Sequence, residues 1–277
     1  LNLSGLTDIF YNQQIYGQLE ATDKYLMNYG YQINSNEKVT LIDSGNVASF
    51  NFDLPDGEHS IAFYAKDSAK NNTDTTITAI FDRQVPILNV QGIDDKYYNQ
   101  KIEGEIEVNE MYLKDFGYKI DERDSISLID SGNVASFSFN LQEGSHQIEF
   151  HARDSASNDT IISNNIIVDK TNPDINIQSP EDKNTYSDQI TVEYSIDEQY
   201  PDSSWYAIII SGTTDTVFTA GETSTTYANR VDLENGEYNI VFNAKDKAGN
   251  DTLLTNNFTV GSVGINDPDA LTASDIQ

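Results

Sequence analysis

The chain repeats itself at a fixed offset of 87 residues. The ten residues Leu41–Phe50 recur unchanged as Leu128–Phe137, and the same offset aligns residues 1–87 with 88–174 without a gap, at 40 identities. A third, more divergent copy extends from Pro173 to about Val260. A duplicated stretch of this size is a domain, so the sequence predicts three domains in tandem. The predicted domains span residues 1–85, 86–172 and 173–262, and residues 263–277 are predicted to form a flexible C-terminal tail.

Apolar and polar residues alternate with a period of two inside each copy. In the first copy Phe50, Phe52 and Leu54 alternate with polar neighbours, and so do Ile61 and Phe63. Clusters of turn residues separate such stretches about every 8–12 positions, and no amphipathic helical stretch is present. About six or seven short strands in each copy indicate an all-β fold built from antiparallel β-sandwiches.

The chain has a single tryptophan, Trp205. It falls where the third strand of such a sandwich would carry a large side chain. Because an indole ring buries much apolar area, we expect Trp205 to pack in the core of the third copy.

The charge balance narrows the range of partners. The chain has 45 acidic against 16 basic residues, a net charge of −29, which repels nucleic acid and anionic membranes but attracts divalent cations. It has no Cys, which excludes disulfides and thiolate metal sites, and no apolar run approaches the roughly 20 residues of a membrane span, so we expect no membrane insertion. The chain begins at Leu1 rather than Met, so we expect a processed product or an excised fragment.

Two short junctions connect the copies. Each of the segments Phe81–Pro86 and Val168–Pro173 follows an alternating strand and ends in a proline, which fixes the backbone dihedral at the exit. Such linkers leave little slack, so we expect the three domains to form an extended, semi-rigid array.

The hairpin of each copy resembles the bacterial immunoglobulin-like (Ig-like) domain. That family pairs a hairpin ending in Ala-x-Asp-x-Ala-Gly-Asn with a Val-Asp-x-x-x-Pro junction, and the third copy is closest to it over Asn235–Asn250. The resemblance covers about 260 of the 277 residues and implies three tandem Ig-like sandwiches, as in extracellular adhesin and stalk proteins of bacterial cell surfaces. The first two copies depart from it, because Lys70 and Ser157 replace the turn glycine. We therefore expect the turn geometry to differ among the copies.

The tail carries a second resemblance. Residues 263–269 and the terminal Asp275-Ile-Gln277 are similar to the lead-in of the sorting domain found in type IX secretion substrates. This resemblance implies a protein that is displayed on the outer surface or released.

Acidic residues recur at three positions of the repeat. They are a loop residue after the second strand (Glu110, Glu198), the Asp of the hairpin (Asp154, Asp246) and the Asp of the junction (Asp82, Asp169). In an Ig-like sandwich the first two lie at the end of the domain where its chain enters, so the junction Asp of one copy should approach both acidic residues of the next. Three carboxylates with backbone carbonyls and water could supply the six to eight oxygens that Ca²⁺ takes, whereas Mg²⁺ demands a tighter octahedron. Members of the family in large secreted adhesins use junction carboxylates for Ca²⁺, as the resemblance also implies. The two predicted metal sites are Asp82, Glu110 and Asp154, and Asp169, Glu198 and Asp246.

A second interpretation of these residues stays open. An Asp that opens a turn accepts hydrogen bonds from backbone N–H groups shortly after it, and this alone would explain the hairpin and junction positions. One observation favours the first interpretation: the third copy has Gly261 where the junction Asp would stand, and no further copy follows it in the sequence, so the junction Asp occurs only where a following copy must dock.

No motif of catalysis is present: we find no nucleophile elbow, phosphate loop or His-rich metal motif. An enzyme rarely needs its active site three times, whereas an extended array needs many copies of one domain. We therefore predict a non-enzymatic extracellular stalk or adhesin segment whose partners are neighbouring domains of the same protein or a surface fibre. A glycan or protein ligand is a further class of partner. The alternative is a carbohydrate-binding or accessory module of a secreted polysaccharide-degrading enzyme.

Overall fold

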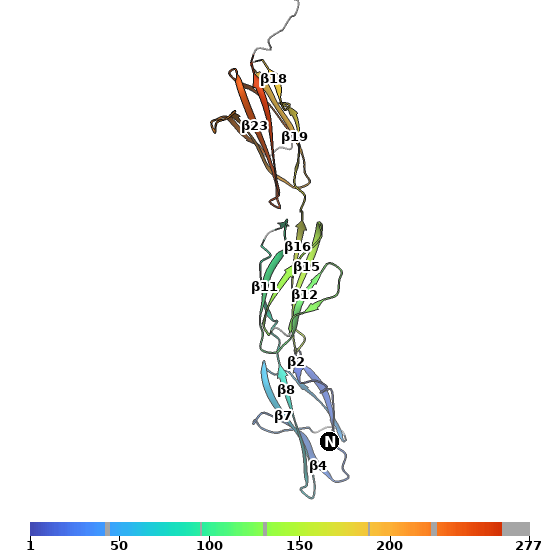
Figure 1. The fold of residues 1–277 in the computed structure, drawn as a ribbon. Coiled ribbons are helices and arrows are strands. Elements are labelled where there is room, and N and C mark those ends of the chain that lie inside the picture. Colours follow the sequence, from blue (N-terminus) through green and yellow to red (C-terminus); the bar gives the residue numbers. More distant parts are fainter. Residues whose placement is uncertain (42–44, 95, 130–131, 188, 223–225, 262–277) are drawn as a thin grey trace, which may run out of the picture. The chain divides into compact units, whose positions relative to one another are not determined.

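The computed structural model describes residues 1–41, 45–94, 96–129, 132–187, 189–222 and 226–261 (Figure 1). Regular structure in these residues is β-strand, with no α-helix, so the all-β prediction is confirmed. Within the same residues no helix has the length and apolar character needed to cross a bilayer. The predicted tail and its resemblance to a sorting domain lie outside the described residues.

Within the described residues, each repeat contributes eight strands. The first repeat has β1 (Asn2–Ser4), β2 (Phe10–Tyr11), β3 (Ile15–Glu20), β4 (Leu26–Ile33), β5 (Val39–Thr40), β6 (Val47–Phe52), β7 (Gly57–Asp67) and β8 (Asn72–Phe81). The second has β9 (Ile87–Gln91), β10 (Tyr97–Tyr98), β11 (Ile102–Asn109), β12 (Leu113–Ile120), β13 (Ile126–Ser127), β14 (Val134–Phe139), β15 (Gly144–Asp154) and β16 (Asp159–Val168). The third has β17 (Asp174–Ser179), β18 (Asn184–Tyr186), β19 (Gln189–Asp197), β20 (Pro201–Ile210), β21 (Thr216–Glu222), β22 (Thr226–Asp232), β23 (Gly236–Asp246) and β24 (Asp251–Val260).

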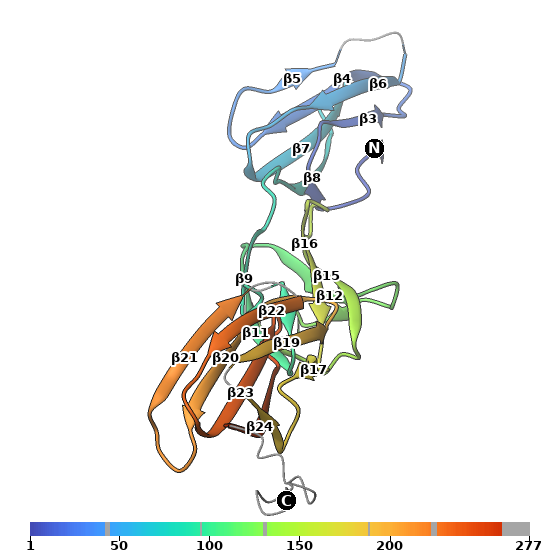
Figure 2. The ribbon, with the colours of Figure 1, turned by 90° about the horizontal axis from the view of Figure 1, so that it is seen from above.

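The strand order is the same in all three repeats. In the first, β1-β3-β6 form a three-stranded sheet and β2-β8-β7-β4-β5 a five-stranded one, and the other repeats have the matching pairs of sheets. The short pairing of β2 with β8 is parallel, while the other pairings described in this repeat are antiparallel. The third repeat differs most in β21, which has seven residues where β5 and β13 have two (Figure 2).

The core of the first repeat lies between its two sheets. Leu19 and Phe50 from the smaller sheet meet Ile61 and Phe63 from the larger one, and each of these four side chains is at most 5% exposed. Their polar neighbours in sequence point away because successive side chains of a strand face opposite sides. Burying one such side chain stabilises the fold by about 1.5–3 kcal/mol, so this alternation selects the register.

Trp205 does not pack in the core, which corrects our expectation. Its ring is 36% exposed on the outer face of β20, while its neighbours Ser204 and Tyr206 are 2% and 0% exposed. A shift of one residue along a strand exchanges the two faces, and Tyr206 occupies the inward position that we had assigned to the tryptophan.

The hairpin turns also differ from our expectation, because all three have the same geometry. Lys70, Ser157 and Gly249 have φ angles of 73°, 72° and 92°, in the left-handed region that favours glycine. The two non-glycine residues are held there by the same hydrogen bonds that close the glycine turn, described below.

The chain forms two compact units, and the division runs through the second repeat. The first unit comprises residues 1–94, 103–139 and 146–165, and the second comprises residues 95–102, 140–145 and 166–277. All residues of the first predicted metal site belong to the first unit, and all residues of the second site belong to the second unit.

Candidate functional site: two carboxylate clusters at the repeat junctions

The first cluster contains Asp82, Glu110 and Asp154. Each offers a carboxylate oxygen, and these three oxygens lie within 4.8 Å of one another. Asp82 directly follows β8, Glu110 directly follows β11, and Asp154 is the last residue of β15, so three strand ends supply the three carboxylates. The sequence prediction that these residues meet is therefore correct in its geometry, while metal binding stays a prediction.

Asp154 is held by its own hairpin turn. One carboxylate oxygen accepts a hydrogen bond from the Asn158 backbone N at 2.8 Å and the other from Asn158 Nδ2 at 2.6 Å. The side chain of Asp154 is 0% exposed. A buried carboxylate needs such partners, since an isolated charge in a protein interior is strongly destabilising.

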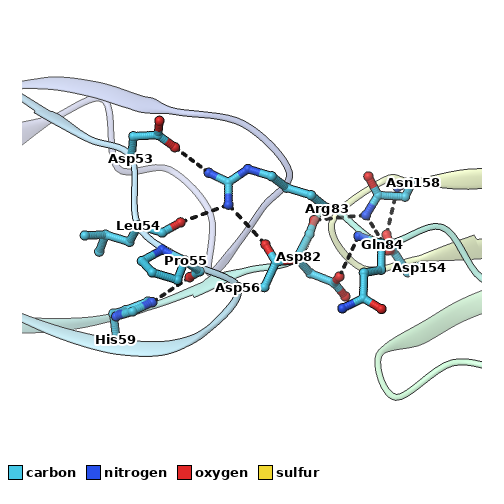
Figure 3. Close-up of polar contacts among 10 residues, drawn as sticks. All are labelled: Asp53, Leu54, Pro55, Asp56, His59, Asp82, Arg83, Gln84, Asp154 and Asn158. Atoms are coloured by element: carbon cyan, nitrogen blue, oxygen red, sulfur yellow. Dashed lines mark hydrogen bonds and ion pairs between the residues drawn. The ribbon is translucent and has the colours of Figure 1, made fainter.

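Two side chains of the second repeat bind the backbone of the junction, and Figure 3 shows the first of them, Asn158, beside Asp82. Asn158 Nδ2 also donates to the backbone oxygen of Asp82 at 2.9 Å, and the Thr160 hydroxyl donates to the backbone oxygen of Pro86 at 2.6 Å. These bonds hold the segment that carries Asp82 against the turn that carries Asp154. They explain why the two carboxylates, far apart in sequence, meet.

The other two carboxylates also bind their own turns. Asp82 Oδ1 accepts from the backbone N of Gln84 at 3.1 Å, and Glu110 Oε1 accepts from the backbone N of Tyr112 at 2.9 Å. Turn formation, our second interpretation, is therefore observed at each position. These bonds use one oxygen of each side chain, and no described donor bonds the second oxygen of Asp82 or Glu110.

The second cluster repeats this arrangement with Asp169, Glu198 and Asp246, whose carboxylate oxygens also lie within 4.8 Å of one another. Asn250 donates to both oxygens of Asp246 at 2.8 and 2.6 Å and to the backbone oxygen of Asp169 at 2.9 Å. The backbone bonds to the other two carboxylates and the threonine bond to the junction proline recur as well. The Thr171 backbone N donates to the Asp169 carboxylate at 3.1 Å, and the Tyr200 backbone N donates to the Glu198 carboxylate at 2.8 Å. The Thr252 hydroxyl donates to the Pro173 backbone oxygen at 2.6 Å.

Among the described residues, no ion pair joins a basic side chain to a carboxylate of either cluster. Arg83 follows Asp82 in sequence, but its guanidinium binds Asp53 at 2.7 Å and Asp56 at 3.0 Å on the first repeat, away from the cluster (Figure 3). Burial raises the pKa of Asp169, and the negative charge of Asp246 adds to this effect, against the hydrogen bond from Thr171 N. A bound cation would relieve this repulsion.

The donor set fits calcium. Three carboxylates supply up to six oxygens, and Ca²⁺ is bound by six to eight oxygens at about 2.3–2.6 Å, so two ligands of one ion can lie up to about 5.2 Å apart. The spacing within 4.8 Å satisfies this limit in both clusters. The residues that would hold the ions are the six predicted ones.

The first repeat has the corresponding residues without a cluster of three among the described residues. Asp23 Oδ1 accepts from Tyr25 N at 2.7 Å, and Asp67 accepts from Asn71 N at 2.8 Å and from its Nδ2 at 2.6 Å. The side-chain hydrogen bond from Asn71 lowers the pKa of Asp67.

The sequence reasoning missed the residues that bind the junction backbone. Asn158 and Thr160 have counterparts in Asn250 and Thr252, so the recurrence that identified the carboxylates could have identified them too. Aromatic contacts across the junctions were also missed. Phe10 packs against Tyr112, with ring centroids 5.1 Å apart, and Tyr97 packs against Tyr200 at 5.3 Å.

Residues 133–262 match the family described as bacterial Ig-like domain (group 3). The chain is therefore similar to bacterial Ig-like domains over residues 133–262. The matched segment includes the hairpin of the second repeat and the whole of the third, and the first repeat aligns with the second without a gap. The tandem Ig-like sandwiches that the resemblance implied are therefore confirmed as the fold.

No curated protein sequence matches the chain. Solved structures with similar folds include a tetra-tandem repeat from the extending region of a large adhesion protein, at 17% identity and a TM-score of 0.37, covering 90% of this chain and 71% of that one. Three N-terminal domains of the Hoc capsid protein of bacteriophage RB49 match at 9% identity and a TM-score of 0.42, covering 92% and 96%. An engineered protein matches at 18% identity and a TM-score of 0.29, covering 35% of this chain but only 22% of that one.

Proposed function

We propose that this chain is a non-enzymatic extracellular segment of a bacterial stalk or adhesin, in which Ca²⁺ at each junction fixes one Ig-like repeat against the next. The observation that carries the proposal is the pair of matched clusters. Each one combines the junction Asp of one repeat with two acidic residues of the following repeat. A domain that only had to fold would have no need to collect carboxylates at both of its connections.

The physical effect of calcium follows from charge. Three carboxylates within 4.8 Å repel one another, and a net charge of −29 adds to the repulsion along the chain. A divalent cation removes the local repulsion and binds oxygens from two consecutive repeats at once. A ligand that binds only the native state stabilises it by about 2.7 kcal/mol at a hundredfold excess over Kd. Calcium would therefore raise the stability of the junctions and restrict their motion, which suits a spacer.

A distance measurement across the first junction tests this role. Because the chain has no Cys, the substitutions Thr78→Cys and Ser138→Cys place two spin labels at exposed positions on β8 and β14. We expect millimolar Ca²⁺ to narrow the distribution of label distances and a chelator to broaden it again. The matched control adds Asp82→Asn, which should keep the distribution broad in both conditions. Equal widths with and without Ca²⁺ in the unsubstituted background would contradict the proposal.

One observation favours the alternative, a carbohydrate-binding module. Trp205 is 36% exposed on an outer sheet face, and exposed aromatic rings can stack on sugar rings. Affinity electrophoresis in gels that contain soluble polysaccharides tests this alternative. Retardation that Trp205→Ala abolishes would support it, whereas unchanged mobility in all gels would leave the stalk as the better account.

A further inference from the structure

The first repeat carries, at the end where its chain enters, the same surface that binds the preceding junction in the second and third repeats. This docking surface consists of Asp23, Tyr25, Asp67, Asn71 and Thr73. Their counterparts in the second repeat are Glu110, Tyr112, Asp154, Asn158 and Thr160, and in the third repeat Glu198, Tyr200, Asp246, Asn250 and Thr252.

In both internal junctions this surface recognises three features of the preceding segment. The asparagine binds the backbone oxygen of the junction Asp at 2.9 Å, and the threonine binds the backbone oxygen of the junction Pro at 2.6 Å. The tyrosine packs against an aromatic residue of the preceding repeat, Phe10 in one case and Tyr97 in the other. A segment with the pattern Asp-x-x-x-Pro and a nearby aromatic ring therefore satisfies the whole surface.

In the first repeat these groups are exposed. Tyr25 is 64% exposed, whereas its counterparts Tyr112 and Tyr200 are half-buried. Asn71 and Thr73 are also exposed, and no described residue accepts a hydrogen bond from the Thr73 hydroxyl. Asn71 and Thr73 border a hollow that is also lined by Leu1 and Leu26.

The docking surface is already in its binding geometry. The Ser68 backbone N binds the Tyr25 oxygen at 2.9 Å, as Ser155 binds Tyr112 at 2.8 Å in the second repeat. The two bonds from Asn71 to Asp67 have the same lengths, 2.8 and 2.6 Å, as those from Asn158 to Asp154. Binding at this surface would therefore require little rearrangement.

We propose that this surface of the first repeat docks the end of another Ig-like domain, one that bears an Asp-x-x-x-Pro junction and an aromatic residue on its β2-like strand. Asn71 would donate to the backbone oxygen of the Asp, Thr73 would donate to that of the Pro, and Tyr25 would pack on the aromatic ring. The inference rests on the bonds at the two internal junctions, and it does not depend on calcium.

The third repeat of a second copy of this chain does not fit as the partner. Gly261 N donates to the Tyr186 oxygen at 2.9 Å, as Asp82 N does to the Tyr11 oxygen at 2.9 Å, so Gly261 occupies the junction Asp position without a carboxylate. By the pairing of β18 with β24, Thr185 stands where the first two repeats have an aromatic residue. The residue four positions after Gly261 is Ile265 instead of proline. The docking surface therefore selects a domain end of the kind found in the first two repeats.

The test adds a junction segment in register. Leu1 aligns with Leu88, so the extension Phe-Asp-Arg-Gln-Val-Pro-Ile, which copies residues 81–87, is placed directly before Leu1. In the presence of a chelator, we expect this extension to slow hydrogen exchange of the Asn71 side-chain amide and to raise the melting temperature by several degrees. The same residues in permuted order form the control extension. The conservative variant Thr73→Val in the extended chain should reduce the gain in melting temperature without disturbing the turn.

A second arm distinguishes a partner on the same polypeptide from one on a separate chain. The seven-residue peptide is added at millimolar concentration to the unextended protein, and saturable shifts of the Asn71 and Thr73 amide resonances are recorded. Shifts in this arm would show that a separate chain can dock, and a response of the fused extension alone would assign the surface to a preceding domain of the same chain. If neither the fused nor the added segment protects Asn71, or if the permuted extension acts equally well, the proposal is wrong. Calcium binding at the internal junctions is measured separately, so its outcome does not decide this one.

Discussion

Asn158 Nδ2 donates a hydrogen bond to the backbone oxygen of Asp82 at 2.9 Å, across 76 residues of sequence. The same amide nitrogen donates to the Asp154 carboxylate at 2.6 Å. One side chain thus connects the junction backbone to the hairpin turn of the second repeat. This arrangement makes the asparagine, which no charge argument identifies, the structural centre of the junction.

Asn158→Ala should therefore destabilise the protein. The substitution removes a donor from Asp154, which is 0% exposed, and leaving a buried polar group without its partner costs about 1–3 kcal/mol. The matched control is Asn71→Ala in the first repeat, where Asp67 is only half-buried and water can replace the lost donor. Urea unfolding measures both losses. Equal losses for the two variants would show that the junction contributes nothing beyond the turn.

Ser157→Gly should stabilise the hairpin of the second repeat. Ser157 has a φ of 72°, where a side chain costs roughly 1 kcal/mol relative to glycine, and the third repeat already has Gly249 at this position. The gain is reduced because glycine loses more backbone entropy on folding, so we expect up to about 1 kcal/mol. Gly249→Ala is the reverse control and should destabilise. Thermal unfolding in a chelator measures both, and a loss of stability in Ser157→Gly would argue against strain in the turn.

The pH dependence of stability should report the burial of Asp169. Burial raises its folded pKa above the ordinary value of about 3.9, so its protonation stabilises the folded state below that value. This contribution is lost as the pH rises through the raised folded pKa. In a chelator, the stability of Asp169→Asn relative to the unsubstituted protein should therefore increase from about pH 4 toward neutrality. Urea unfolding at several pH values checks this, and a difference that does not change with pH would contradict it.

The repeat made much of this structure predictable. Equivalent positions could be compared inside one chain, so the recurring acidic residues identified both clusters, and the alternation of residues such as Ile61 and Phe63 identified the sandwich cores. The periodicity predicts which residues share a face of a strand. It does not fix which of two neighbouring aromatic residues points inward.

The periodicity and the residue types did not predict the position of Trp205 or the geometry of the hairpin turns. Both Trp205 and Tyr206 are large enough to fill the core of the third repeat, and only the pairing of β20 with β23 decides that Tyr206 does so. In the turn, residue type alone suggested that Lys70 and Ser157 would adopt a different geometry from Gly249. The bonds between the hairpin Asp and Asn impose one geometry on all three, because these side-chain hydrogen bonds within the turn outweigh a backbone preference of about 1 kcal/mol.

Calcium titration by calorimetry, at a salt concentration that screens diffuse binding to the surface, tests the central claim most directly. We predict two ions per chain, one ion for each of the single variants Asp82→Asn and Asp169→Asn, and none for the double variant. The first repeat serves as the internal control, since Asp23→Asn should leave the stoichiometry at two. Binding of no ions by the unsubstituted chain, or two ions in the double variant, would contradict the account.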